Sequence, residues 1–110
     1  MEIVFENIDD KVVFSVIGRL DTSNYEIASE KINEKIDGGA LMMVADLSKM
    51  DYISSSGLRV FLSVLKKLKA AGGNIALCGI QPKIKEVFEI SGFNSLFIIT
   101  DTKEEALSKL

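Results

Sequence analysis

The chain has 110 residues, of which 47% are hydrophobic, so it suits one domain with a single core. Its formal charge of −3 disfavours nucleic-acid binding, because no basic stripe is present to release counterions from phosphates. Cys78 is the only cysteine, which excludes an intrachain disulfide. The apolar runs are far shorter than the roughly 20 residues of a membrane span, and no signal peptide is visible. We therefore expect a cytoplasmic protein that does not act at a membrane.

Two short apolar runs at the start of the chain, Ile3–Phe5 and Val12–Ile17, are typical of strands. The polar stretch between them carries Asp9-Asp10, a turn signal, which predicts an antiparallel hairpin. Gly18 is expected to end the second strand. A first helix is predicted over Ser23–Ile36, because Ser23 and Glu26 have capping-box spacing.

The run Leu41–Ala45 lacks polar alternation, which favours a strand covered on both faces. A loop follows, and a second helix is predicted from Ser55 or Ser56 to Ala71. Val60 and Val64 lie beside its apolar stripe, so they either reach the core or form a half-exposed flank. The main stripe of this helix consists of Leu58, Phe61, Leu62, Leu65 and Leu68.

The last third of the chain continues the alternation of strands and helices. Asn74–Gly79 is a second buried-type strand, and Pro82 opens a helix that Gly92 ends. Leu96–Ile99 is the last predicted strand, followed by a short helix capped by Asp101 or Thr102. Since helical crossovers give parallel pairing, this order predicts one α/β domain. Its sheet is mixed and mainly parallel, with an N-terminal antiparallel hairpin and about four helices packed against it.

Three consecutive hydroxyls, Ser54, Ser55 and Ser56, fall where the loop becomes the second helix. A helix start carries unpaired N–H groups and a partial positive charge, so a serine there is a good cap. A phosphate on one of these hydroxyls would also be well placed. One cap requires only one serine, so both interpretations stay open for the other two.

Several enzyme classes are disfavoured by missing residues. The chain has no histidine, so a Ser–His–acid triad cannot form, and no G-x-S-x-G elbow is present. The glycine-rich motifs that bind nucleotide phosphates, G-x-x-x-x-G-K-[ST] and G-x-G-x-x-G, are both absent. Asp46 ends a buried strand, which is where receiver domains carry the aspartate that is phosphorylated. Receiver domains have an all-parallel sheet, however, and the predicted N-terminal hairpin does not fit that arrangement. We expect no enzymatic activity, no metal and no cofactor.

Three groups of residues resemble one known pattern. Gly18-Arg19-Leu20-Asp21 is similar to a G-x-L-D motif after a second strand, and Asp46-Leu47-Ser48 with Ser56-Gly57-Leu58 is similar to a D-L-…-D-S-[SA]-G-L core. Gly72-Gly73, Pro82 and Ser91-Gly92 resemble later landmarks of the same pattern. The pattern is that of the STAS domain of bacterial anti-sigma factor antagonists. The resemblance covers essentially the whole length and implies a single STAS domain over residues 1–110.

The resemblance implies a partner-switching protein. Its unphosphorylated form would bind an anti-sigma factor that is a serine kinase and so free a sigma factor. Phosphorylation by that kinase would abolish binding, and a serine phosphatase would reset the protein. Aligned on Ser-Gly-Leu, the acceptor falls on Ser55, with Ser54 and Ser56 as neighbouring candidates. The implied partner-binding residues are Asp21, Thr22, Ser23, Ser54, Ser56, Gly57, Leu58, Arg59, Val60 and Val64.

An alternative keeps the fold but lacks the switch: a STAS interaction module within a larger regulatory assembly or on a transporter. The free-standing length favours the switch, since a transporter module would be fused to membrane spans. We also expect Asp21 to lie near Ser55, because both follow strand ends, and we expect a monomer.

Overall fold

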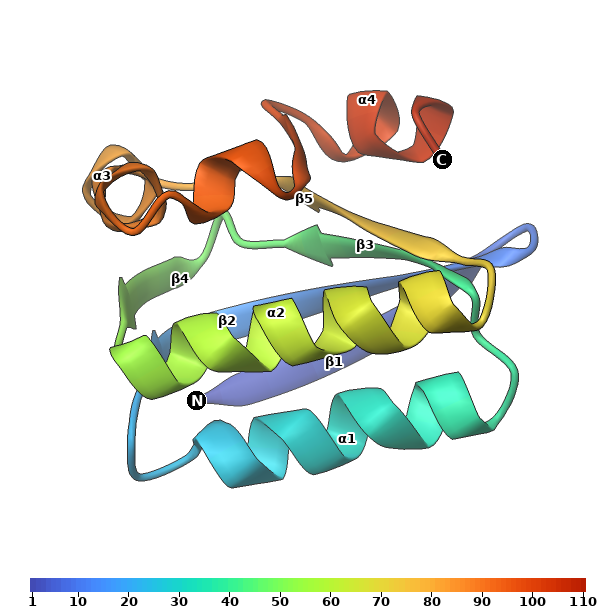
Figure 1. The fold of residues 1–110 in the computed structure, drawn as a ribbon, viewed down its shortest axis with the longest axis horizontal. Coiled ribbons are helices and arrows are strands. Elements are labelled where there is room, and N and C mark those ends of the chain that lie inside the picture. The colour runs from blue at the N-terminus through green and yellow to red at the C-terminus, as the bar shows by residue number, and fades with distance from the viewer.

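A computed structural model describes residues 1–110 as a sheet covered on both faces by helices (Figure 1). The strands are β1 (Glu2–Ile8), β2 (Lys11–Leu20), β3 (Met42–Asp46), β4 (Met50–Ile53), β5 (Asn74–Cys78) and β6 (Ile98–Thr100). The helices are α1 (Tyr25–Asp37), α2 (Ser55–Ala70), α3 (Pro82–Ile90) and α4 (Lys103–Ser108), with a 3-10 turn η1 (Phe93–Ser95). None of these helices has both the length and the apolar content needed to cross a membrane.

The sheet has the order β1-β2-β3-β5-β6, and β4 pairs separately with β2. The β1–β2 pair is antiparallel, with Phe5 opposite Phe14, and every other pair is parallel. Asp9 occupies the hairpin turn with a positive φ of 56°, a conformation that aspartate tolerates better than most residues. The predicted mixed sheet with an N-terminal hairpin is therefore confirmed.

The strand β4 is absent from the sequence-based prediction, which placed a loop there. Its residues show no alternation: Met50 and Ile53 are buried at the ends, while Asp51 and Tyr52 between them are exposed. The prediction that β2 ends at Gly18 is also wrong. Gly18 has φ 90° and marks an irregularity in register, after which β2 continues to Leu20 alongside β4. Because glycine adopts this φ without a Cβ penalty, the strand bends rather than stops.

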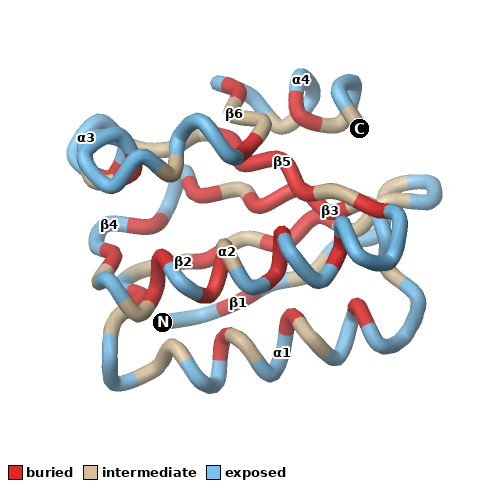
Figure 2. Tube along the Cα trace, in the orientation of Figure 1, coloured by how far each residue is buried: buried red, intermediate tan, exposed pale blue.

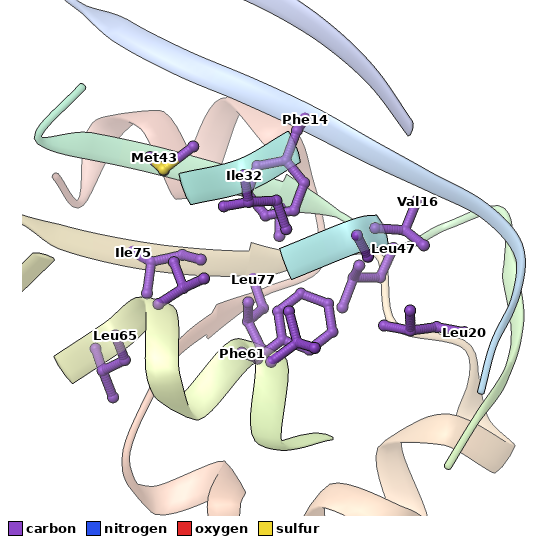
Figure 3. Close-up of a cluster of buried hydrophobic side chains, with 14 of the residues drawn as sticks. Phe14, Val16, Leu20, Ile32, Met43, Leu47, Phe61, Leu65, Ile75 and Leu77 are labelled. Carbon is purple, nitrogen blue, oxygen red and sulfur yellow. The ribbon is translucent and has the colours of Figure 1, made fainter. Parts of the chain in front are cut away.

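The main core lies between one face of the sheet and the helices α1, α2 and α3. Figure 2 shows buried residues recurring along α1 and α2 and making up most of β3 and β5. In Figure 3, Phe14 and Val16 of β2, Ile32 of α1 and Phe61 of α2 point into this layer. Phe88 brings α3 into the same cluster, with its ring centroid 6.3 Å from that of Phe61. The short helix α4 covers the opposite face, where Ala106 packs in a smaller apolar cluster.

Two further boundaries differ from the prediction. Leu96 was expected to begin the last strand, but it follows the η1 turn and β6 begins at Ile98. The Ser23–Glu26 capping box does not form, because α1 begins at Tyr25 with Asn24 at its N-cap. At the last helix, Thr102 is the cap, since its hydroxyl accepts a hydrogen bond from the backbone N–H of Glu105.

Candidate functional site

The predicted site lies where β2 and β4 end side by side and α2 begins. Leu20 pairs with Ile53, and the backbone N–H of Ser54 donates a 3.0 Å hydrogen bond to the Leu20 carbonyl. Asp21 and Ser54 therefore leave two neighbouring strands at the same edge of the sheet. This register brings the start of the β2–α1 loop beside the start of the serine run, and the expected proximity of Asp21 to Ser55 stays a prediction.

The three serines occupy three different environments. Ser54 is the N-cap of α2, and its hydroxyl accepts a 3.1 Å hydrogen bond from the backbone N–H of Gly57. Ser55 is the first residue of the helix and is exposed, and its hydroxyl is bonded to no other residue of the chain. Ser56 is half-buried and faces α1. Since Ser54 alone meets the need for a cap, the cap does not explain Ser55.

Gly57 holds the start of α2 close to the sheet. A Cβ at this position would lie 2.8 Å from Cγ1 of Ile53 and 3.0 Å from the carbonyl oxygen of Leu20. Both distances are shorter than van der Waals contact, so any larger side chain would push the helix away from the strand ends. The close approach brings the start of α2, where Ser55 lies, next to the ends of β2 and β4.

Four members of the predicted partner-binding set are buried, which corrects their expected role. Gly57 and Leu58 pack inward, and Val60 and Val64 are only 4% and 1% exposed. Val60 and Val64 thus belong to the core rather than to a half-exposed flank. Their side chains anchor α2 and are almost wholly buried, whereas Arg59 is exposed on the same helix.

The loop between β2 and α1 is held by an aspartate-centred turn. A carboxylate oxygen of Asp21 accepts hydrogen bonds from the backbone N–H and the hydroxyl of Ser23, at 2.9 and 2.6 Å. These bonds, helped by the Arg19 guanidinium, lower the pKa of Asp21 below its ordinary value. Asn24 accepts a hydrogen bond from the Asp21 N–H and donates one to the Arg19 carbonyl. Thr22 and Ser23 are exposed on this fixed turn.

A surface pair beside the serine run was not predicted. The Arg19 guanidinium lies 4.0 Å from the ring centroid of Tyr52, and its Nε lies 3.5 Å from an Asp21 carboxylate oxygen. Arg19 and Tyr52 meet because they are paired between β2 and β4. The aromatic residue before Ile53 was the available signal, but it could be used only once β4 was known to be a strand.

A cleft of about 340 Å³ separates the N-terminal halves of α1 and α2 next to Ser55. None of its α1 residues belongs to the predicted partner-binding set. The cleft is formed by two helices that are far apart in the sequence, so no local pattern indicated it. The lining residues are Tyr25, Glu26, Ser29 and Glu30 of α1 with Ser56, Arg59, Val60 and Ser63 of α2. The cleft therefore presents hydroxyls and charges of both signs beside the exposed serine.

The chemistry of this site centres on the exposed hydroxyl of Ser55. A serine nucleophile needs a base in hydrogen-bond contact, and no side chain is bonded to the Ser55 hydroxyl. No group of three acidic or cysteine side chains lies close enough to bind a metal ion. An exposed hydroxyl at the positive end of a helix can, however, carry a phosphate at little cost to the fold.

The model of the STAS domain family matches residues 2–106, so the chain belongs to the STAS domain family. Bordetella bronchiseptica BtrV, whose assignment as an anti-sigma factor antagonist is provisional, is 38% identical over 96% of this chain and 91% of its own. The anti-sigma F factor antagonist of Paenibacillus polymyxa is 25% identical over 100% of this chain and 95% of its own.

Solved structures show the same fold. A Thermotoga maritima protein has a TM-score of 0.92 at 23% identity, covering 96% of this chain and 92% of its own. The anti-sigma factor antagonist SpoIIAA in its unphosphorylated form has a TM-score of 0.77 at 23% identity, covering 98% of this chain and 96% of its own. A structure of SpoIIAA from Bacillus in the phosphorylated form gives 0.76 at 24% identity, covering 98% of each chain.

Proposed function

We propose that this protein is an anti-sigma factor antagonist that a phosphate on Ser55 switches off. In the unphosphorylated state it binds an anti-sigma factor that is also a serine kinase, and binding frees a sigma factor. Modification of Ser55 by that kinase releases the anti-sigma factor, and a serine phosphatase restores the active state. The observation that carries the proposal is the exposed, unbonded Ser55 hydroxyl at the first position of α2.

The relatives support this proposal in two ways. BtrV and the Paenibacillus polymyxa protein are named as antagonists of anti-sigma factors. SpoIIAA, which shares the fold, exists in a phosphorylated and an unphosphorylated form. The surface proposed to contact the partner consists of the exposed or half-buried members of the predicted set: Asp21, Thr22, Ser23, Ser54, Ser56 and Arg59.

The magnitude of the electrostatic effect is sufficient for a switch. A phosphate brings about −1.5 to −2 charges at neutral pH. If the partner presents a carboxylate about 6 Å away, each unit of charge costs roughly 2–3 kcal/mol at an effective dielectric of about 20. That cost weakens binding by about 30-fold or more per unit charge, with no refolding of the antagonist.

The acceptor is tested by incubating the purified protein with the anti-sigma factor kinase of the same organism and ATP. Mass spectrometry of the peptides is expected to place one phosphate on Ser55. The Ser55→Ala variant is expected to stay unmodified, and the matched Ser56→Ala variant to be modified as the parent is. Phosphate on Ser54 or Ser56 of the Ser55→Ala protein would contradict the assignment. A kinase that binds every variant and modifies none would favour a non-switching interaction module.

A further inference from the structure

We propose that Arg59 is the intramolecular partner of a phosphate on Ser55, and that phosphorylation thereby withdraws its guanidinium from the α1–α2 cleft. This inference rests on the proposed function and concerns how that same site is regulated. It assigns to Arg59 a role in the phosphorylated state, in addition to its place on the proposed contact surface.

The spacing on α2 brings the two side chains together. Ser55 and Arg59 lie four residues apart in one helix, so their Cβ atoms are neighbours at about 5–6 Å. Side chains in a helix lean toward its N-terminus, so the Arg59 side chain is long enough to reach back over the turn that contains Ser55. Both residues are exposed, so neither has to leave the core to meet the other.

The guanidinium of Arg59 has no competing ion pair. The four salt bridges of the chain use other cations, namely Lys11, Arg19, Lys67 and Lys103. Glu26 and Glu30 line the same cleft from α1, but neither lies within salt-bridge distance of Arg59. A phosphate carries nearly twice the charge of a carboxylate and accepts the guanidinium through two parallel hydrogen bonds. It is therefore expected to outcompete both glutamates.

The backbone of the first turn offers a phosphate only the N–H groups of Ser55 and Ser56. The N–H of Gly57 is already bonded to the Ser54 hydroxyl, and the N–H of Leu58 is bonded to the Ser54 carbonyl. The helix terminus offers partial charge, but the guanidinium is the one full positive charge lining the cleft beside Ser55.

Two consequences follow for the partner that reads this surface. The guanidinium stabilises the doubly charged phosphate, so the modification keeps its full charge near neutral pH. The cleft meanwhile loses its only cation and keeps the carboxylates of Glu26 and Glu30. Phosphorylation thus changes the charge at two neighbouring places with one chemical event.

The test installs phosphoserine at position 55 during translation, so that neither kinase nor partner is needed. The second ionisation of the phosphate is then followed by ³¹P NMR as the pH is varied. We expect its midpoint to lie about 0.5 pH higher in Arg59→Gln than in the parent, with Arg59→Lys between them. Lys66→Gln serves as the control. It removes an exposed cation of α2 that lies eleven residues beyond Ser55, and it is expected to match the parent.

A second signal checks the contact itself. The Nε–H resonance of Arg59 is expected to move with the same midpoint as the phosphate in the parent protein. The inference would be overturned if the phosphate midpoints of the parent and Arg59→Gln were equal. It would also be overturned if the Arg59 Nε–H chemical shift did not change as the phosphate titrates. Because phosphoserine is built in, these results do not depend on whether a kinase modifies Ser55. A failed kinase assay would thus contradict the proposed function and leave this contact standing.

Discussion

The backbone N–H of Ser54 donates a 3.0 Å hydrogen bond to the carbonyl of Leu20, joining the start of α2 to the end of β2. One residue beyond each partner lie Ser55 and Asp21, the two side chains expected to meet a binding protein. A single backbone bond therefore sets the position of the exposed hydroxyl relative to the β2–α1 loop.

The three serines should separate by their effect on stability. Ser54→Ala is expected to lower the free energy of unfolding by about 1 kcal/mol, because the N–H of Gly57 loses its hydrogen-bond acceptor. Ser55→Ala removes no hydrogen bond and is expected to change stability by less than about 0.5 kcal/mol. Urea unfolding of both variants measures the difference. Equal losses would show that the cap is not assigned correctly.

Gly57→Ala is expected to destabilise the protein by about 1–3 kcal/mol, although alanine is the better helix former. The added methyl group would lie 2.8 Å from Cγ1 of Ile53 and would force α2 away from the sheet. Ser63→Ala, at an exposed position of the same helix, serves as the control and is expected to be neutral or slightly stabilising. A Gly57→Ala protein that unfolds at the same urea concentration as Ser63→Ala would contradict the close approach.

The Asp21 turn makes a prediction about pH. The Ser23 hydroxyl and N–H lower the pKa of Asp21 below 3.8, so this carboxylate contributes stability above its unfolded pKa. That contribution is lost as the pH falls through the folded pKa. Ser23→Ala is expected to raise the Asp21 pKa toward its ordinary value, as followed by the carboxyl carbon in an NMR titration. Thr22→Ala removes a neighbour with no bond to Asp21, and it should leave the titration unchanged.

Cys78 is expected to be unreactive in the folded protein. Burial, with Asp46 across the β3–β5 pair as a smaller cause, raises the pKa of its thiol from 9.0 to about 11. The thiolate fraction at pH 8 is then about 100-fold lower than in the unfolded chain, so Ellman's reagent should react correspondingly more slowly without urea than with it. Since the folded pKa is the higher one, Cys78 contributes stability below about pH 9 that is lost as the pH rises toward 11.

Much of the architecture follows from periodicity in the sequence. The hairpin around Asp9, the unbroken apolar run of β3 and the stripe of α2 each carry a pattern that one element explains. The strand β4 has no such pattern, because its two exposed residues, Asp51 and Tyr52, stand between buried ends. Only its pairing with β2 makes it a strand, and pairing partners cannot be read from a local window.

The candidate site divides in the same way. The serine run at the start of α2 is a local signal, so its position could be predicted. Whether Val60 and Val64 reach the core depends on how closely α2 approaches the sheet, and Gly57 decides that through contacts with Leu20 and Ile53. The cleft needed the relative placement of α1 and α2, which no stretch of sequence encodes alone.

The most direct test of the switch is the affinity of the anti-sigma factor kinase for three versions of this chain. These are the unmodified protein, the protein with phosphoserine at position 55, and a control with phosphoserine at Ser108, which is exposed on α4 across the sheet. Calorimetry is expected to show binding weakened by about 30-fold or more for phosphoserine 55 and nearly unchanged for the control. Equal affinity of the unmodified and phosphoserine-55 proteins would contradict the proposed switch.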